Sequence, residues 1–286
     1  MRKLLLCLPL LVAAQLAAQQ QPDWTTPLAP FAIADNLYYV GSRDLAAYLV
    51  TTPQGDILID SNLESSPPLI RRSVEQLGFH WADIKILLIV HAHYDHAAGS
   101  AGILNETHAK FMVMDGDVEA IESGGAREFG LPKDTYPPAH VDRILHDGNT
   151  IQLGGVTVVA HKTPGHTRGC TTFTMRTTQH GVPRNVVIVG GWSVLDNFRL
   201  VDTPGHPASY PNIAADFQHT FDVLKSLPCD IFLGAHGIYF DMLPKLARAN
   251  PADPEAVWVD PQGYRKGVAE HEQDFHDILH RQQAGN

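Results

Sequence analysis

The chain has 286 residues, 44% of them hydrophobic and 18% charged, which suits one large α/β domain or two small ones. Its formal net charge is −10 and it has no basic stripe, so its composition disfavours a nucleic-acid partner. It contains no low-complexity segment and no internal repeat of roughly 20–50 residues, which excludes repeat architectures.

Residues 1–18 have the features of a secretory signal peptide. Arg2 and Lys3 precede an apolar run over 4–14, and a small-residue cleavage site ends at Ala18. The apolar run is too short to span a bilayer. We therefore expect export to the periplasm and a mature, monomeric domain of residues 19–286 that is not bound to the membrane. An uncleaved N-terminal anchor is the alternative.

The first part of the mature chain alternates between strands and helices. A helix is expected to start at Ser65 or Ser66, with Pro67 and Pro68 in its first turn, and to end near Gly78. A second helix is expected over 97–105. Residues 53–56 form a hairpin turn. Strands are predicted at 31–41, 45–52, 57–61, 84–90 and 110–115.

The second part repeats this organisation after a loop-rich region over 116–146. New strands start near Thr150, a last strand covers 229–236, and helices are expected over 211–227 and 263–283. Each set of strands needs a cover, and no disordered linker separates the sets. We therefore predict a single α/β domain in which two sheets pack face to face with helices outside, an αββα sandwich.

The segment HAHYDHAAG (91–99) carries the strongest chemical signal. His91 and His93 are two residues apart, so on an extended segment they project the same way, and Asp95 continues this alternation beside His96. Imidazole and carboxylate are good ligands for zinc. A lone histidine is usually structural or solvated, but four ligand types within six residues after an apolar strand predict a metal site.

Two more histidines follow predicted strands. His166 lies in the turn TPGHT, and His236 ends the last strand just before Gly237. Because both repeat the order of strand, tight loop and histidine, we expect them at the same sheet edge as the motif. His161 competes with His166 but lacks the turn residues, so we expect it behind the ligands.

These motifs together resemble the metallo-β-lactamase superfamily, and most of all its subclass B3. The similarity covers nearly all of the mature chain. It implies the αββα fold with two zinc ions at one edge of the sheets. It also implies that His91, His93 and His166 hold one zinc and that Asp95, His96 and His236 hold the other. The similar stretches are NLYYVG (36–41), HAHYDHAAGS (91–100), TPGHTRGCTTFTM (163–175) and CDIFLGAH (229–236).

The resemblance implies a zinc-dependent β-lactamase. A zinc-bound hydroxide, oriented by Asp95, would attack the β-lactam amide of penicillins, cephalosporins and carbapenems without a covalent intermediate. Other members hydrolyse lactones or, as glyoxalase II does, thioesters, and many carry an aspartate in a "GD" pair that bridges the metals. The matching stretch here reads Gly190-Gly191, which favours the β-lactamase. A periplasmic zinc-binding protein without activity is a third hypothesis.

The resemblance also suggests how substrate is held. Subclass members often bind the substrate carboxylate through two serines, and here that pair reads Gly191 and Ser193. Ser193 would donate one hydrogen bond, and losing the other would cost roughly 1.5–3 kcal/mol. Trp192 is expected to line the cleft or to pack. The loop over 124–138 is expected to flank the substrate.

The cysteine pattern departs from that of the subclass. Cys229 fits one half of a disulfide that the subclass often has, but Tyr264 stands where the other cysteine is expected. We therefore expect Cys170 and Cys229 to be free.

Overall fold

The computed structural model describes residues 23–285, so the predicted signal peptide lies outside it. Seven strands form the first sheet in chain order, and five form the second in the order β12-β11-β10-β9-β8. The first sheet contains β1 (Phe31–Ala34), β2 (Leu37–Tyr39), β3 (Tyr48–Val50), β4 (Asp56–Ile59), β5 (Ile84–Leu88), β6 (Lys110–Met114) and β7 (Arg143–Leu145). The second contains β8 (Asn149–Leu153), β9 (Val156–Lys162), β10 (Thr171–Gln179), β11 (Val182–Val189) and β12 (Ile231–Gly234).

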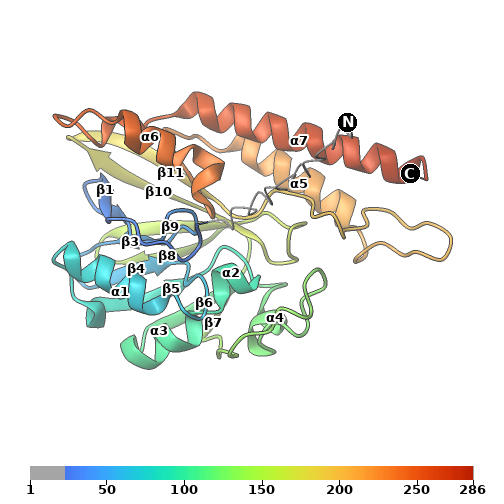
Figure 1. Ribbon diagram of the computed structural model, residues 1–286, viewed down its shortest axis with the longest axis horizontal. Coiled ribbons are helices and arrows are strands. Elements are labelled where there is room, and N and C mark those ends of the chain that lie inside the picture. The colour runs from blue at the N-terminus through green and yellow to red at the C-terminus, as the bar shows by residue number, and fades with distance from the viewer. Residues whose placement is uncertain (1–22, 286) are drawn as a thin grey trace, which may run out of the picture.

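Helices cover the outer face of each sheet, so the predicted αββα sandwich is confirmed (Figure 1). Beside the first sheet lie α1 (Pro67–Gln76), α2 (Tyr94–Ala97), α3 (Ser100–Thr107), α4 (Val118–Glu122) and the 3-10 turn η1 (Trp81–Asp83). Beside the second lie α5 (Ile213–Ser226), α6 (Met242–Arg248), α7 (Pro261–Gln283) and the turns η2 (Gly237–Phe240) and η3 (Ala256–Trp258). No helix within residues 23–285 is long and apolar enough to span a membrane.

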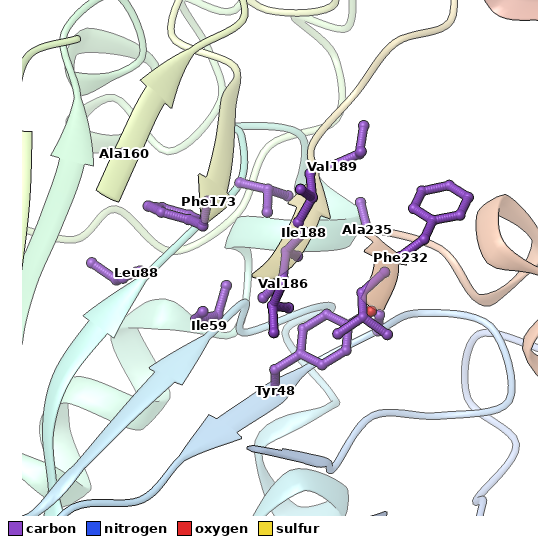
Figure 2. Close-up of a cluster of buried hydrophobic side chains, with 14 of the residues drawn as sticks. Tyr48, Ile59, Leu88, Ala160, Phe173, Val186, Ile188, Val189, Phe232 and Ala235 are labelled. Carbon is purple, nitrogen blue, oxygen red and sulfur yellow. The ribbon is translucent and has the colours of Figure 1, made fainter. Parts of the chain in front are cut away.

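Alternation along the strands divides the apolar side chains between two buried layers. Ile57 and Ile59 of β4 face the other sheet, whereas Leu58 between them packs with the helices that include α1. Figure 2 shows Ile59 and Leu88 of the first sheet meeting Phe173 and other side chains of the second sheet. Each fully buried aliphatic side chain stabilises the fold by about 1.5–3 kcal/mol.

Strand direction brings the chemically active loops together. β4, β5 and β6 are parallel, so the residues that follow them emerge at one edge of the first sheet. Backbone hydrogen bonds then join the two sheets at that edge. The Thr171 N–H donates to the Val90 carbonyl at 2.7 Å, and the Ala46 N–H donates to the Ala235 carbonyl at 3.0 Å.

Three predicted elements differ in detail. Residues 31–41 form two strands, because the chain turns at Asp35-Asn36. The loop-rich region contains α4 and β7. The expectation that Asp95 continues an extended segment is wrong, because the chain stays extended only to His93 and then enters α2. Asp95 and His96 therefore reach the site from a helical turn.

Candidate metal centre

The HAHYDH segment is held in place by a buried carboxylate from the neighbouring strand end. Asp60 directly follows β4 in a left-handed conformation, with φ of 70°, which aspartate tolerates better than most residues. Its Oδ1 accepts the Val90 N–H at 2.8 Å, and its Oδ2 lies 3.2 Å from His96 Nδ1. Asp60 thus fixes both the start of the motif and one of its histidines.

The first group of candidate ligands consists of His91, His93 and His166. One ring nitrogen of each lies within 4.8 Å of the others, and all three side chains are buried. Their ring centroids are 4.7–4.8 Å apart in edge-on arrangements. The structure therefore brings together three histidines from two loops, although strands β6 to β9 lie between these loops in the sequence.

The second group consists of Asp95, His96 and His236. His96 Nε2 lies 3.1 Å from His236 Nε2, and Asp95 Oδ2 lies 3.5 and 3.6 Å from these two nitrogens. A ring nitrogen of His91 also lies within 4.8 Å of ligand atoms of Asp95 and His96, so His91 connects the two groups. All six residues that the sequence predicts as ligands therefore converge at one point.

The donor set fits divalent zinc. Both ring nitrogens of His91 are buried without a hydrogen-bond partner, which is costly unless a metal ion takes the lone pair. Burial and the adjacent His93 imidazole lower the pKa of His166 to about 3, and burial also holds the pKa of His91 well below its usual range. Neutral imidazoles are the form that binds zinc. Burial raises the pKa of Asp95, but His96 and His236 outweigh this effect and hold that pKa below its usual range.

An acceptor orients the outward nitrogen of three of these histidines. His166 Nδ1 donates to the Ser193 carbonyl at 2.8 Å. Asp60 faces His96 in the same way, and Asp44 Oδ2 lies 3.1 Å from His236 Nδ1. Because each outward nitrogen is the donor, the inward Nε2 keeps its lone pair for a metal ion.

A fourth carboxylate, that of Glu128, faces His93. Glu128 Oε2 lies 3.7 Å from His93 Nε2. The same oxygen accepts the Gly130 N–H at 2.6 Å. The loop over 124–138 therefore reaches the metal centre through a buried side chain.

Asp117 joins the two ligand loops. Its Oδ2 accepts the Ala92 N–H at 2.9 Å and the Thr167 hydroxyl at 2.7 Å, and its Oδ1 accepts the Gly169 N–H at 2.7 Å. Ala92 lies between His91 and His93, and Thr167 follows His166. One buried carboxylate thus sets the spacing of the first ligand group.

Sequence analysis missed Asp44, Asp60, Asp117 and Glu128. Asp60 has a signal that could have been used, because it directly follows the apolar strand ILI just as His91 follows another strand. The other three have no such signal. Their partners lie 25 to 192 residues away in the sequence, and only the folded chain shows the contacts.

A groove of about 710 Å³ opens above the ligands. His93, Asp95, His166 and His236 line it. Its walls are largely apolar and come from the N-terminal segment, α2, the loop over 124–138, the segment after β11, η2 and α6. The apolar wall residues are Trp24, Tyr94, Leu131, Leu195, Ile238, Tyr239, Met242, Leu243 and Pro244.

Of the three residues expected at the substrate, only Ser193 lines the groove. Trp192 is 1% exposed and stacks on His271 of α7, with ring centroids 4.2 Å apart, so it packs in the core and does not line the cleft. Gly191 is also buried, with its N–H 2.9 Å from Cys170 Sγ. A Cβ at Gly191 would collide with the His166 ring. Of the two alternatives for Trp192, the structure shows packing, and the expectation that Gly191 lies at the substrate is corrected because Gly191 does not line the groove.

His161 does not support any ligand, contrary to the expectation that it lies behind them. It lies in β9, where its Nε2 is 2.8 Å from the Thr174 hydroxyl, and it lines a different cavity. Cys170 and Cys229 are free, as predicted. Tyr264 is buried, and its hydroxyl donates to the Leu224 carbonyl at 2.7 Å.

A family model described as the metallo-beta-lactamase superfamily matches residues 44–236, which contain all six candidate ligands. The chain belongs to this superfamily. The metallo-β-lactamase FEZ-1 from Legionella gormanii is 46% identical, over 90% of this chain and 98% of its own, with a TM-score of 0.85. BJP-1, a subclass B3 metallo-β-lactamase of Bradyrhizobium japonicum, is 33% identical, over 92% and 98% of the two chains, with a TM-score of 0.84.

Two further proteins are similar to this chain. The metallo-β-lactamase GOB-18 from Elizabethkingia meningoseptica is 35% identical, over 91% and 96% of the two chains, with a TM-score of 0.85. A probable metallo-hydrolase of Burkholderia pseudomallei is 29% identical over 124 residues. That match covers 41% of this chain and only 42% of the relative. The full-length structural matches thus fall among superfamily members that are named as β-lactamases.

Proposed function

We propose that this superfamily member is a zinc-dependent β-lactamase that hydrolyses the amide bond of the four-membered lactam ring. The observation that carries the proposal is the absence of a carboxylate beside His166, within residues 23–285. Gly191 lies beside His166, at the position where the resemblance places the bridging aspartate of other superfamily members. Asp95 is therefore the only carboxylate in either ligand group. The identity of 33–46% with proteins named metallo-β-lactamases over nearly their whole length supports the same function.

The proposal includes two zinc ions. His91, His93 and His166 would hold one, and Asp95, His96 and His236 the other. When bound, the ions supply a water molecule of lowered pKa and positive charge where negative charge develops on the lactam oxygen. Three protein ligands per ion leave room for water and substrate, as in catalytic zinc sites, whereas a purely structural site would be closed.

The residues of this chain orient the reactants. Asp95 is ionised at neutral pH and faces the groove, so its carboxylate can accept a hydrogen bond from the attacking water and fix its direction. The apolar walls exclude water around the ring and pack against substrate side chains. Because Trp24, Leu131 and Ile238 lie on different walls, the groove suits variable apolar substituents, which supports activity on penicillins, cephalosporins and carbapenems.

We also propose that the mature enzyme is a periplasmic monomer. The signal-like residues 1–18 support export. N-terminal sequencing of the protein from a periplasmic extract should find a start near Gln19, and size-exclusion chromatography should give the mass of one chain. Recovery of the full-length chain in the membrane fraction would contradict the proposal of export with cleavage.

The decisive experiment measures turnover by zinc-loaded protein of four compounds: a carbapenem, a cephalosporin, a lactone and a glutathione thioester. We expect hydrolysis of the two β-lactams, with loss on chelation and recovery when zinc is restored, and no turnover of the other two. Turnover of the lactone or thioester alone would make the protein a different hydrolase of this fold. Zinc binding without any turnover would make it a zinc-binding protein.

A further inference from the structure

Tyr239 lines the groove, and neither the HAHYDH motif nor the candidate ligand set gives this residue a role. It lies in η2, three residues after His236, and its ring is 5.2 Å from the His236 ring and 5.2 Å from the Trp192 ring. Its ring also packs close to Gly234, where an added Cβ would be 2.9 Å from Cδ2. These contacts hold the side chain at the groove wall, beside the second ligand group.

Ser193 places a second hydroxyl at the same point of the wall. Its carbonyl accepts the Nδ1–H of His166 at 2.8 Å, which anchors its backbone to the first ligand group. Its side chain is within hydrogen-bonding reach of the Tyr239 hydroxyl, and both residues line the groove. Position 191 contributes no hydroxyl, because a side chain there would overlap the His166 ring. Tyr239 therefore has a hydroxyl on the same groove wall as Ser193, and its ring packs against Trp192, the residue before Ser193.

The Tyr239 hydroxyl can act as a donor to a ligand in the groove. A phenol has an ordinary pKa of about 10, so it keeps its proton at neutral pH. Because Tyr239 lines the groove, its O–H can serve there as a neutral donor.

The charges of the groove indicate what this donor binds. Among residues 23–285, Arg43 is the only lysine or arginine that lines it, and its Nε donates to Asp23 at 2.7 Å. Apart from bound metal, no unpaired cationic side chain of the groove walls is therefore available to a substrate anion. The hydroxyls of Tyr239 and Ser193 are neutral donors on this wall that could bind a carboxylate.

We propose that Tyr239 and Ser193 form a hydroxyl pair that binds the carboxylate of the β-lactam substrate, with the Tyr239 O–H as its donor. This inference rests on the proposed β-lactamase function and specifies its substrate contact. Tyr239 is a substrate-positioning residue in this role. It lies beside His236 and Asp95, so the carboxylate is held on the side of the second ligand group, away from His93.

Tyr239→Phe removes only the hydroxyl and tests the role directly. For a β-lactam with a free carboxylate, we expect KM to rise about tenfold, with kcat within about twofold, because a ground-state contact is lost. Zinc content and Tm should not change. Tyr38→Phe is the matched control, because it removes an exposed tyrosine hydroxyl from β2. An unchanged KM would overturn the proposal, and so would a fall in kcat at constant KM, which would indicate contact with the lactam oxygen.

A second measurement keeps the test independent of turnover. A hydrolysed penicillin should bind zinc-loaded wild type about tenfold more tightly than Tyr239→Phe by calorimetry, and equal affinities would overturn the proposal. Ser193→Ala should weaken binding too, and adding it to Tyr239→Phe should cost less than the sum of the single changes. Additive effects would contradict a pair. Failure of wild type to hydrolyse any β-lactam would refute the proposed function, whereas an unaffected Tyr239→Phe in an active enzyme would refute only this inference.

Discussion

Gly191 lies so close to the His166 imidazole that a side chain at position 191 would overlap the ring. The Gly191 backbone is also fixed from behind, because its N–H and carbonyl both contact Cys170 Sγ. The glycine is therefore part of the packing that positions a metal ligand. Its lack of a hydroxyl follows from this packing and is not simply a missing substrate contact.

Introducing a serine at this position tests that relationship. Gly191→Ser should displace His166 and weaken zinc binding at least tenfold, and β-lactam turnover should fall with it. Zinc affinity by competition with a chromophoric chelator measures the effect. Gly102→Ala in α3 is the control, because its added Cβ would make only an ordinary 3.5 Å contact with Pro67. A gain in substrate affinity at unchanged zinc affinity would show that position 191 has room for the hydroxyl.

Asp95→Asn should separate metal binding from catalysis. The amide keeps the shape of the side chain but loses the charge that faces His96 and His236. We expect kcat to fall at least 100-fold while the His91, His93 and His166 group still binds zinc. Steady-state kinetics and metal analysis on the same preparation give both values. Retained turnover would exclude a role for Asp95 in orienting water.

Asp117 should contribute to stability as well as to the site. Its carboxylate accepts three hydrogen bonds, and an asparagine would turn its NH₂ toward at least one of these donors. Asp117→Asn should lower the free energy of unfolding by about 2–4 kcal/mol and weaken zinc binding. Urea unfolding of the metal-free protein isolates the first effect. Wild-type stability in that form would show that the ligand loops hold their spacing without Asp117.

The metal-free protein should lose stability in mild acid. The His166 pKa is lowered from 6.5 to about 3 by burial and by His93. Below pH 6.5 the unfolded chain therefore takes up a proton that the folded chain does not, and stability falls as the pH drops from 6.5 toward 3. One such group contributes about 1.4 kcal/mol per pH unit in this window.

His166→Gln isolates this contribution from the other titrating groups. Burial raises the pKa of Asp117 to about 6, which acts in the opposite sense between about pH 4 and 6 and is common to both proteins. Urea unfolding without metal at pH 6 and pH 5 should show wild type losing about 1.4 kcal/mol more than the variant. Parallel losses in the two proteins would mean that His166 takes up its proton in the folded state.

The sequence alone predicted the architecture and a candidate ligand set, the latter with the help of a family resemblance. A nearly continuous apolar run such as residues 84–90 predicts a buried strand, and HAHYDH after such a strand predicts a metal site. These signals are local: periodicity follows from backbone geometry, and ligand spacing follows from a few consecutive residues. His166 and His236 could also be predicted from local sequence, because each follows a predicted strand.

Only the tertiary structure decided how the ligands are held and what surrounds them. Asp44 and His236 are 192 residues apart, and Asp117 and Gly169 are 52 apart, so no local pattern connects them. The same holds for Trp192, which packs against His271, and for Tyr239, which meets Ser193. Each contact depends on how the two sheets and α7 pack. Packing places the side chains that orient ligands and bind substrate, whereas local periodicity determines only which face of an element is buried.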